Sequence, residues 1–124
     1  LGLAPTLRME AEAFEARTRI VCNCTLSDEP ENLGEGRALA LYRVAQCALH
    51  HIEDGASASS VKLDLRADPD SLSLRIEDDG TTVVPDIDRL MMEAQLARYA
   101  GSLTLMRPTA GGIRLLATLP RTDS

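Results

Sequence analysis

Apolar residues recur every three or four positions in three segments of this 124-residue chain, which is the spacing of one buried helix face. The segments cover residues 6–16, residues 35–53, and a stretch that begins at Pro85 and that Gly101 closes. Proline at a helix start and glycine just past a helix end are typical boundaries, and Gly55 follows the second segment in the same way. The sequence therefore predicts three amphipathic helices.

The third predicted helix has its own apolar stripe, formed by Ile87, Leu90, Met91, Ala94 and Ala97. In an amphipathic helix such a stripe usually faces the core. The adjacent Met91 and Met92 could mark an adaptable binding surface, but methionine more often fills gaps inside a core. We therefore expect the two methionines to belong to a core helix.

Alternation of apolar and polar residues predicts five strands. It runs through residues 18–26, 60–67, 71–78, 102–106 and 113–119. The links DPD and RPTAGG are turn-forming, so the second and third strands, and the last two, should form hairpins. Paired strands mixed with helices indicate one α+β domain over residues 1–124, a two-layer α/β sandwich with about three helices on one face of a mostly antiparallel sheet.

The charge distribution argues against nucleic acid as a partner. The net charge is −6 and Lys and Arg form no cluster, so the basic surface of a nucleic-acid-binding domain is missing. No apolar run approaches the roughly 20 residues of a membrane span, and no leader-like segment opens the chain. We therefore expect a soluble, cytoplasmic segment without membrane contact, although a parent protein could be membrane-anchored.

The chain ends and the cysteines add two expectations. The chain begins at Leu1 without a methionine and ends in the polar PRTDS, so we expect a piece of a longer protein. The cysteines Cys22, Cys24 and Cys47 are odd in number and lack the spacing of a zinc knuckle, which favours reduced thiols. Cys22 and Cys24 fall on one strand face, where small core residues are more common than metal ligands.

The second helix and the hairpin after it resemble a known family. The stretch ALALYRVAQCALHHIEDGASASSVKLDL, followed by a hairpin ending in IEDDG, is similar to the ATP-binding catalytic domain of two-component sensor histidine kinases, in the branch of the nitrate sensors and the membrane-fluidity sensor. The opening LGLAPTLRMEAEAFEARTRI and the closing AGSLTLMRPTAGGIRLLATLP are similar to the two ends of that domain. The resemblance covers nearly the whole chain and implies the Bergerat fold.

The resemblance implies a nucleotide site that is altered on the second helix. The family has a Glu that serves a water or general-base role and, four residues later, an Asn that binds Mg²⁺; these positions are Cys47 and His51 here. A basic residue normally follows three positions on, and here it is Asp54. Because Mg²⁺ prefers oxygen ligands while thiol and imidazole suit softer metals, all three changes disfavour Mg-ATP.

The first glycine motif of the family is only partly present. In its pattern Asp-x-Gly-x-Gly the Asp accepts a hydrogen bond from the adenine amino group, and the glycines let the backbone approach the nucleotide. Asp78 and Gly80 match this pattern, but Thr82 replaces the second glycine. By themselves Asp78, Asp79 and Gly80 could also be an ordinary turn at a strand end.

The later motifs of the family are also reduced. The family has a flexible lid and a Gly-x-Gly turn against the phosphates, whereas residues 81–100 contain no glycine, so the lid is expected to be a stub. Asp86 and Asp88, at the start of the third helix, would repel a triphosphate. Gly111 and Gly112 remain from the last glycine-rich motif.

We interpret the chain as a degenerate ATP-binding domain of a histidine kinase, which needs no cofactor and acts through protein contacts in phosphorelay signalling. The partners that the resemblance implies are the phosphoacceptor helical hairpin of the same protein, a response regulator, and a second copy of the parent protein. The phosphoacceptor His lies in that hairpin, so this segment should be catalytically inactive alone. We predict no catalytic residue and no metal ligand in it.

Two alternatives stay open. The first is an active domain that binds Mg-ATP, with adenine on Asp78 and the metal positioned by His51 or a neighbouring carboxylate. The second is a metal- or redox-responsive module built on Cys47 and His51, although a closed zinc site needs two further ligands and the other cysteines lie on a distant strand. The residues that would form a degenerate nucleotide site are Cys47, His51, Asp78, Gly80, Gly111 and Gly112.

Overall fold

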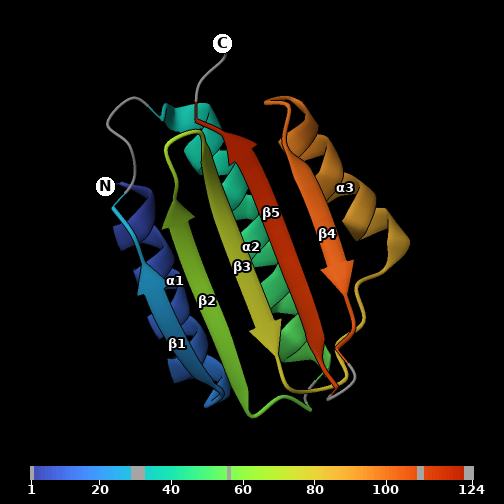
Figure 1. The fold of residues 1–124 in the computed structure, drawn as a ribbon. Helices are drawn as coiled ribbons and strands as arrows, with labels where there is room; N and C mark the ends of the chain where they lie inside the picture. The colour runs from blue at the N-terminus through green and yellow to red at the C-terminus, as the bar shows by residue number, and fades with distance from the viewer. Residues whose placement is uncertain (1, 29–32, 56, 109–110, 122–124) are drawn as a thin grey trace.

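The structure, a computed structural model, describes residues 2–28, 33–55, 57–108 and 111–121. Within these residues it contains three helices and five strands (Figure 1). In chain order they are α1 (Leu3–Thr18), β1 (Val21–Leu26), α2 (Glu35–Gly55), β2 (Ser60–Ala67), β3 (Ser71–Asp78), α3 (Asp86–Ala97), β4 (Ser102–Met106) and β5 (Ile113–Pro120). Over the described residues, none of the helices combines the length and the apolar character needed to cross a membrane.

The five strands form one sheet in the order β1-β2-β3-β5-β4. β1 pairs with β2 in parallel, and the other three neighbouring pairs are antiparallel. A parallel pair needs a crossover connection, which α2 supplies. The helices lie on one face of the sheet, with α1 against β1, α2 behind the central strands and α3 beside β4 (Figure 1). This arrangement confirms the predicted two-layer sandwich.

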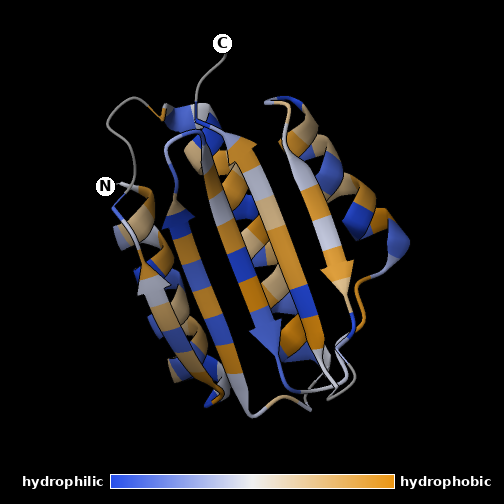
Figure 2. Ribbon diagram, viewed as in Figure 1, coloured by the Kyte–Doolittle hydropathy of each residue, from blue (hydrophilic) through white to orange (hydrophobic). Residues whose placement is uncertain are grey.

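The core lies between the sheet and the helices. Alternate residues of the central strands point to this side and are buried, among them Leu63, Leu74 and Leu115. Figure 2 shows the alternation as orange and blue bands along the strands. From α2, Leu41 and Leu49 are buried against them. Since full burial of a leucine contributes about 1.5–3 kcal/mol, this shared core fixes α2 firmly on the sheet.

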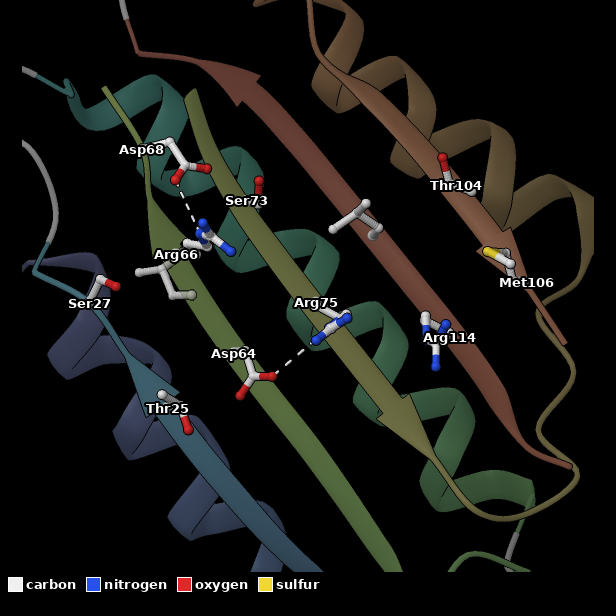
Figure 3. Close-up of a pocket in the computed structure, with 12 residues that line it drawn as sticks. Thr25, Ser27, Asp64, Arg66, Asp68, Ser73, Arg75, Thr104, Met106 and Arg114 are labelled. Carbon is white, nitrogen blue, oxygen red and sulfur yellow. Dashed lines mark hydrogen bonds and ion pairs between the residues drawn. The ribbon is translucent and has the colours of Figure 1, made fainter. Parts of the chain in front are cut away.

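The opposite face of the sheet is polar. Arg75 in β3 lies 3.5 Å from Glu77 and 4.0 Å from Asp64, and Arg114 in β5 donates a hydrogen bond of 2.7 Å to Glu77. A shallow trough of about 670 Å³ runs over this row (Figure 3). The arginines that form the row have carboxylate neighbours, so they present no surplus positive charge. This is the solvent-exposed sheet face that the alternation of apolar and polar residues predicts.

α3 presents a different face to the core than the sequence predicts. Ile87, Leu90 and Met91, from the stripe that we expected to be buried, are 65%, 60% and 59% exposed. Met92 and Leu96 are buried instead, at 2% and 0% exposure. The expectation of a core position is therefore wrong for Met91 and right for Met92. The helix has apolar residues on two faces, and its contacts with α2 and β4 decide which face is buried.

Candidate functional site

Asp78, the last residue of β3, lies at the carboxyl end of the strand with its side chain buried. Its Oδ1 accepts a hydrogen bond of 2.8 Å from the backbone N–H of Ile113. Its Oδ2 accepts one of 2.5 Å from the hydroxyl of Thr82 and a longer one of 3.3 Å from the N–H of Gly80. A carboxylate has about four lone-pair positions, so contacts inside the domain already use most of the acceptor capacity of Asp78.

The glycines around Asp78 are needed by the fold itself. A Cβ on Gly80 would lie 2.6 Å from Ser57 Oγ and 2.7 Å from the backbone nitrogen of Ala58. Gly112 has a φ of +83°, and a Cβ there would collide with the backbone carbonyl of Asp78. Both glycines therefore permit close approaches between backbone segments. We call Asp78, Gly80, Thr82 and Gly112 together the Asp78 end of the site.

Asp79 fixes the segment that follows α2. Its carboxylate accepts hydrogen bonds from the backbone N–H groups of Ser59 and Ser60, at 2.8 and 3.1 Å, and from the Ser59 hydroxyl. The Ser59 hydroxyl and the two backbone N–H groups hold the pKa of Asp79 down at about 2. Asp79 thus has the structural role of a turn residue at a strand end.

The connection from β3 to α3 is short and packs on the body of the domain. It consists of residues 79–85. Thr82 is 1% exposed, and Val84 packs against the core cluster. Asp86 and Asp88 then occupy the first turn of α3. The segment in which the resemblance implies a nucleotide lid is therefore a short link that Thr82 and Val84 attach to the domain.

At the other end of the site, Cys47 and His51 lie one turn apart on α2 and face α3. Asp88 approaches them from the first turn of α3, and His51 Nε2 lies 3.2 Å from Asp88 Oδ2. The possible ligand atoms of the three residues all lie within 4.8 Å of one another. The structure thus brings Cys47 and His51 together, as their spacing predicts, and adds Asp88 to them. From the sequence, Asp88 was expected only to repel phosphate.

A groove between α2 and α3 gives solvent access to this group. Its volume is about 410 Å³. Polar and sulfur-bearing side chains predominate among its lining residues, which include Arg43, Gln46, Cys47, Asp88, Met91 and Gln95. We call this region, with His51 beside it, the α2–α3 groove. Burial, and secondarily the charge of Asp88, raises the pKa of the Cys47 thiol, so Cys47 lacks the low-pKa thiolate of a reactive cysteine.

The other polar residues near the end of α2 form pairs at the surface, and His50 also lines the groove. Asp54, at the position where the family has a basic residue, lies 3.2 Å from His50, and both side chains are about two-thirds exposed at 64% and 66%. Arg17 of α1 donates a hydrogen bond of 2.9 Å to Glu53. These are surface pairs, which contribute little to stability.

The other two cysteines lie far from the groove, on the edge strand β1 at the opposite side of the sheet from β4. Cys22 belongs to the buried core cluster, and Cys24 packs against it. A hydrogen bond with Cys24, together with burial, raises the pKa of Cys22. Their prediction as small core residues is confirmed.

No protein-family model matches this chain, and neither does any curated protein sequence. Solved structures do match it. The ATP-binding domain of PrrB from Mycobacterium tuberculosis is 22% identical, with 97% of this chain and 94% of that chain covered and a TM-score of 0.64. The histidine kinase domain of the blue-light activated histidine kinase from Erythrobacter litoralis EL346 is 19% identical, with 97% and 61% covered and a TM-score of 0.69.

The chain has the fold of histidine kinase ATP-binding domains. A further match, to the Acinetobacter baumannii histidine kinase AdeS, is 12% identical over 98% of this chain and 64% of that one, with a TM-score of 0.66. The chain spans 61% of the blue-light kinase domain and 43% of a longer form of that kinase. The histidine kinase fold that the resemblance implied is confirmed over nearly the whole chain. The nitrate-sensor branch stays a prediction.

Within the histidine kinase fold, the predicted site residues separate into two groups. Asp78, Gly80 and Gly112 meet at the end of β3, and Cys47 and His51 line or adjoin the α2–α3 groove. Gly111 has a φ of +99°, and no atom of the described residues lies within 4 Å of where its Cβ would be. Two contacts of the site were not predicted from the sequence: the hydrogen bond from Thr82 to Asp78 and the approach of Asp88 to His51. The hydroxyl residue four positions after Asp78 could have indicated the hydrogen bond. The approach of Asp88 to His51 depends on how α2 and α3 pack, which no local sequence pattern indicates.

Proposed function

We propose that this chain is the ATP-binding-type domain of a two-component histidine kinase, that its nucleotide site has degenerated, and that it acts through protein contacts. The observation that carries the proposal is the internal bonding of Asp78. Its carboxylate is already bonded to Thr82 and Ile113. The residue that the family uses to recognise adenine thus serves here to join β3, the link to α3, and β5.

An adenine amino group that bound Asp78 in the place of Thr82 would have to displace one of these bonds. Displacing the Thr82 hydroxyl would leave a buried polar group without its partner, because Thr82 is 1% exposed. Such a loss costs about 1–3 kcal/mol, which is comparable to the gain from a new hydrogen bond to the carboxylate. Nucleotide binding at Asp78 would therefore be close to neutral at this contact.

The α2–α3 groove does not suit Mg²⁺ with a triphosphate. Cys47 and His51 stand where the resemblance implies oxygen-bearing ligands, and Mg²⁺ binds sulfur and nitrogen poorly. Asp86 and Asp88 occupy the first turn of α3, where a phosphate group would otherwise be favoured. The donor set therefore fits neither the metal nor the phosphates of Mg-ATP.

Apolar residues on α3 support a role in protein contacts. Val83, just before the helix, is 64% exposed. Ile87, Leu90 and Met91 on the helix are exposed to a similar degree. We propose that they contact the phosphoacceptor helical hairpin of the same protein. A purified hairpin of the parent protein should shift backbone amide resonances of α3, and Leu90→Lys should abolish the shifts. Equal shifts in the Leu90→Lys protein would contradict this contact.

Thermal unfolding with Mg-ATP and Mg-ADP tests the loss of nucleotide binding. A ligand at a hundred times its dissociation constant stabilises a protein by about 2.7 kcal/mol, which corresponds to several degrees for a domain of this size. We expect no shift of the midpoint with either nucleotide. A clear shift with Mg-ATP would instead favour the alternative of an active domain with unusual ligands, for which the retention of Asp78 is the supporting observation.

The double variant Cys47→Glu/His51→Asn sharpens this test by restoring the family's residues on α2. We expect that it still fails to bind Mg-ATP, because Thr82 stays bonded to Asp78 and the glycines of the lid are missing. Isothermal titration calorimetry would measure the affinity. Micromolar binding by this variant would show that the two helix substitutions alone removed nucleotide binding.

A further inference from the structure

Cys47, His51 and Asp88 form a compact group of three different ligand types. Among the described residues, they are the group of histidine, cysteine and carboxylate side chains that could converge on one metal ion. The side chains of His51 and Asp88 are 13% and 30% exposed, and Cys47 is half-buried. Their position is therefore accessible from the groove without being fully solvated.

The distances match a site that closes by small side-chain movements. In a tetrahedral zinc site with bonds of about 2.0–2.3 Å, neighbouring ligand atoms lie about 3.3–3.7 Å apart. His51 Nε2 and Asp88 Oδ2 are 3.2 Å apart, and the widest separation within the group does not exceed 4.8 Å. The ligand atoms therefore need to approach one another by at most roughly 1–1.5 Å to complete the geometry.

The backbone holds the three residues in place. Cys47 and His51 are four residues apart on α2, so their side chains lie on the same helix face. α2 is fixed by its buried stripe, and α3 packs against it through Met92 and Leu96. Two ligands on one rigid helix and a third on its neighbour make a site whose geometry does not depend on a loop.

We propose that Cys47, His51 and Asp88 bind a zinc ion, with water in the fourth position, in the α2–α3 groove. Thiolate, imidazole and carboxylate together are a donor set for zinc rather than for Mg²⁺ or Ca²⁺. Three protein ligands and an open position facing the groove complete a tetrahedral site. The ion joins α2 to the first turn of α3. This inference goes beyond the proposed function and does not depend on whether the groove once held nucleotide.

An ordinary ion pair between His51 and Asp88 is the competing explanation of their contact. His50 and Asp54 form such a pair at a distance of 3.2 Å, with both side chains about two-thirds exposed. An ion pair gives Cys47 no role, whereas the zinc site requires its sulfur. Loss of the Cys47 sulfur therefore separates the two explanations.

The test uses Co²⁺ in place of Zn²⁺ with the 124-residue chain. We expect Co²⁺ to produce a thiolate-to-cobalt charge-transfer band and the intense visible bands of tetrahedral cobalt, and Zn²⁺ to displace it. Cys47→Ser should abolish the charge-transfer band, and Asp88→Asn should weaken the affinity at least about tenfold. The matched control Cys24→Ser, which lies on the distant strand β1, should bind like the unaltered chain. Circular dichroism would verify that each variant is folded.

Three outcomes would overturn the proposal. They are no cobalt spectrum, an octahedral spectrum without a charge-transfer band, and unchanged Zn²⁺ affinity in the folded Cys47→Ser protein. The nucleotide experiment has a separate readout: a midpoint shift with Mg-ATP in metal-free protein would contradict the loss of nucleotide binding and leave the zinc site standing. Failure of zinc binding would likewise leave the proposed function intact.

Discussion

The Asp78 end and the α2–α3 groove belong to one region of the fold but have opposite physical characters. At the Asp78 end the side chains are buried, bonded to one another and packed so closely that Gly80 and Gly112 admit no Cβ. In the groove, Cys47 and Asp88 are half-exposed and line a solvent-accessible space. One end is therefore part of the structural framework, and the other is a surface that can accept a ligand.

This difference coincides with the division between residues that match the family's motifs and residues that do not. Asp78, Gly80 and Gly112 match the family, and each has a contact inside the domain that requires it. Cys47 and His51 differ from the residues that the family has at these positions. They line or adjoin a solvent-accessible groove, where the backbone does not require a particular side chain. These three matches to the family motif therefore do not by themselves indicate nucleotide binding, because the fold gives a sufficient reason for them.

The largest expected effect is that of Asp78→Ala. The substitution leaves the Ile113 N–H, the Gly80 N–H and the buried Thr82 hydroxyl without an acceptor. At about 1–3 kcal/mol for each of these three groups, we expect a loss of at least about 3 kcal/mol in the free energy of unfolding. Urea denaturation would measure it. The control Asp79→Ala removes an exposed carboxylate and should cost about 1 kcal/mol; equal losses would show that the Asp78 end is not a structural centre.

The next effect concerns the two adjacent glycines. Gly112→Ala places a methyl group against the carbonyl of Asp78 at a φ of +83°, so we expect a loss of about 2–4 kcal/mol. Gly111→Ala is a matched control, because φ is +99° there but no atom of the part of the chain that the structure describes lies near the new Cβ. It should cost only the left-handed conformation, about 1–2 kcal/mol. Chemical denaturation of both variants gives the comparison, and a larger loss for Gly111→Ala would contradict it.

The fold was largely predictable because one face of the sheet is exposed to solvent, which makes apolar and polar residues alternate along each strand. Alternation along residues 60–67 and 71–78 fixes which side chains point to the helices, and the structure places those strands as predicted. The buried face of α3 was not predictable. Met92 and Leu96 form one apolar face and Ile87, Leu90 and Met91 another. Periodicity identifies both faces, but only the packing of α3 on α2 selects between them.

The candidate site was predictable in its positions and not in its contacts. The resemblance located Cys47, His51 and Asp78 from local spacing alone. It treated Thr82 as a missing glycine, whereas the Thr82 hydroxyl is a bonding partner of Asp78. It predicted that Asp88 repels phosphate, whereas Asp88, on α3, contacts His51, on α2. Such contacts depend on tertiary packing, which a pattern along one segment does not contain.

A smaller effect should appear in the pH dependence of stability. The folded-state pKa of Asp79 lies at about 2, below the ordinary value of 3.8, because Ser59 and Ser60 donate hydrogen bonds to the carboxylate. The charged form therefore stabilises the fold above about pH 4, and this contribution is lost as the pH falls towards 2. Since Asp79 is exposed, solvent screening limits it to about 1 kcal/mol or less. Asp79→Asn should flatten the stability profile between these pH values in urea titrations; an unchanged slope would contradict this role.

The smallest expected effect is that of Asp88→Asn in metal-free protein. The side chains of Asp88 and His51 are 30% and 13% exposed, and an ion pair that is open to solvent on one side contributes about 0–1 kcal/mol. With a chelator present, we expect the free energy of unfolding to change by about 0.5 kcal/mol or less, because the amide of asparagine can still form a hydrogen bond with His51. With zinc present, the unaltered chain should gain stability that Asp88→Asn lacks. A large loss in the chelated protein would mean that the α2–α3 groove, like the Asp78 end, belongs to the structural framework, and the contrast between the two ends would no longer hold.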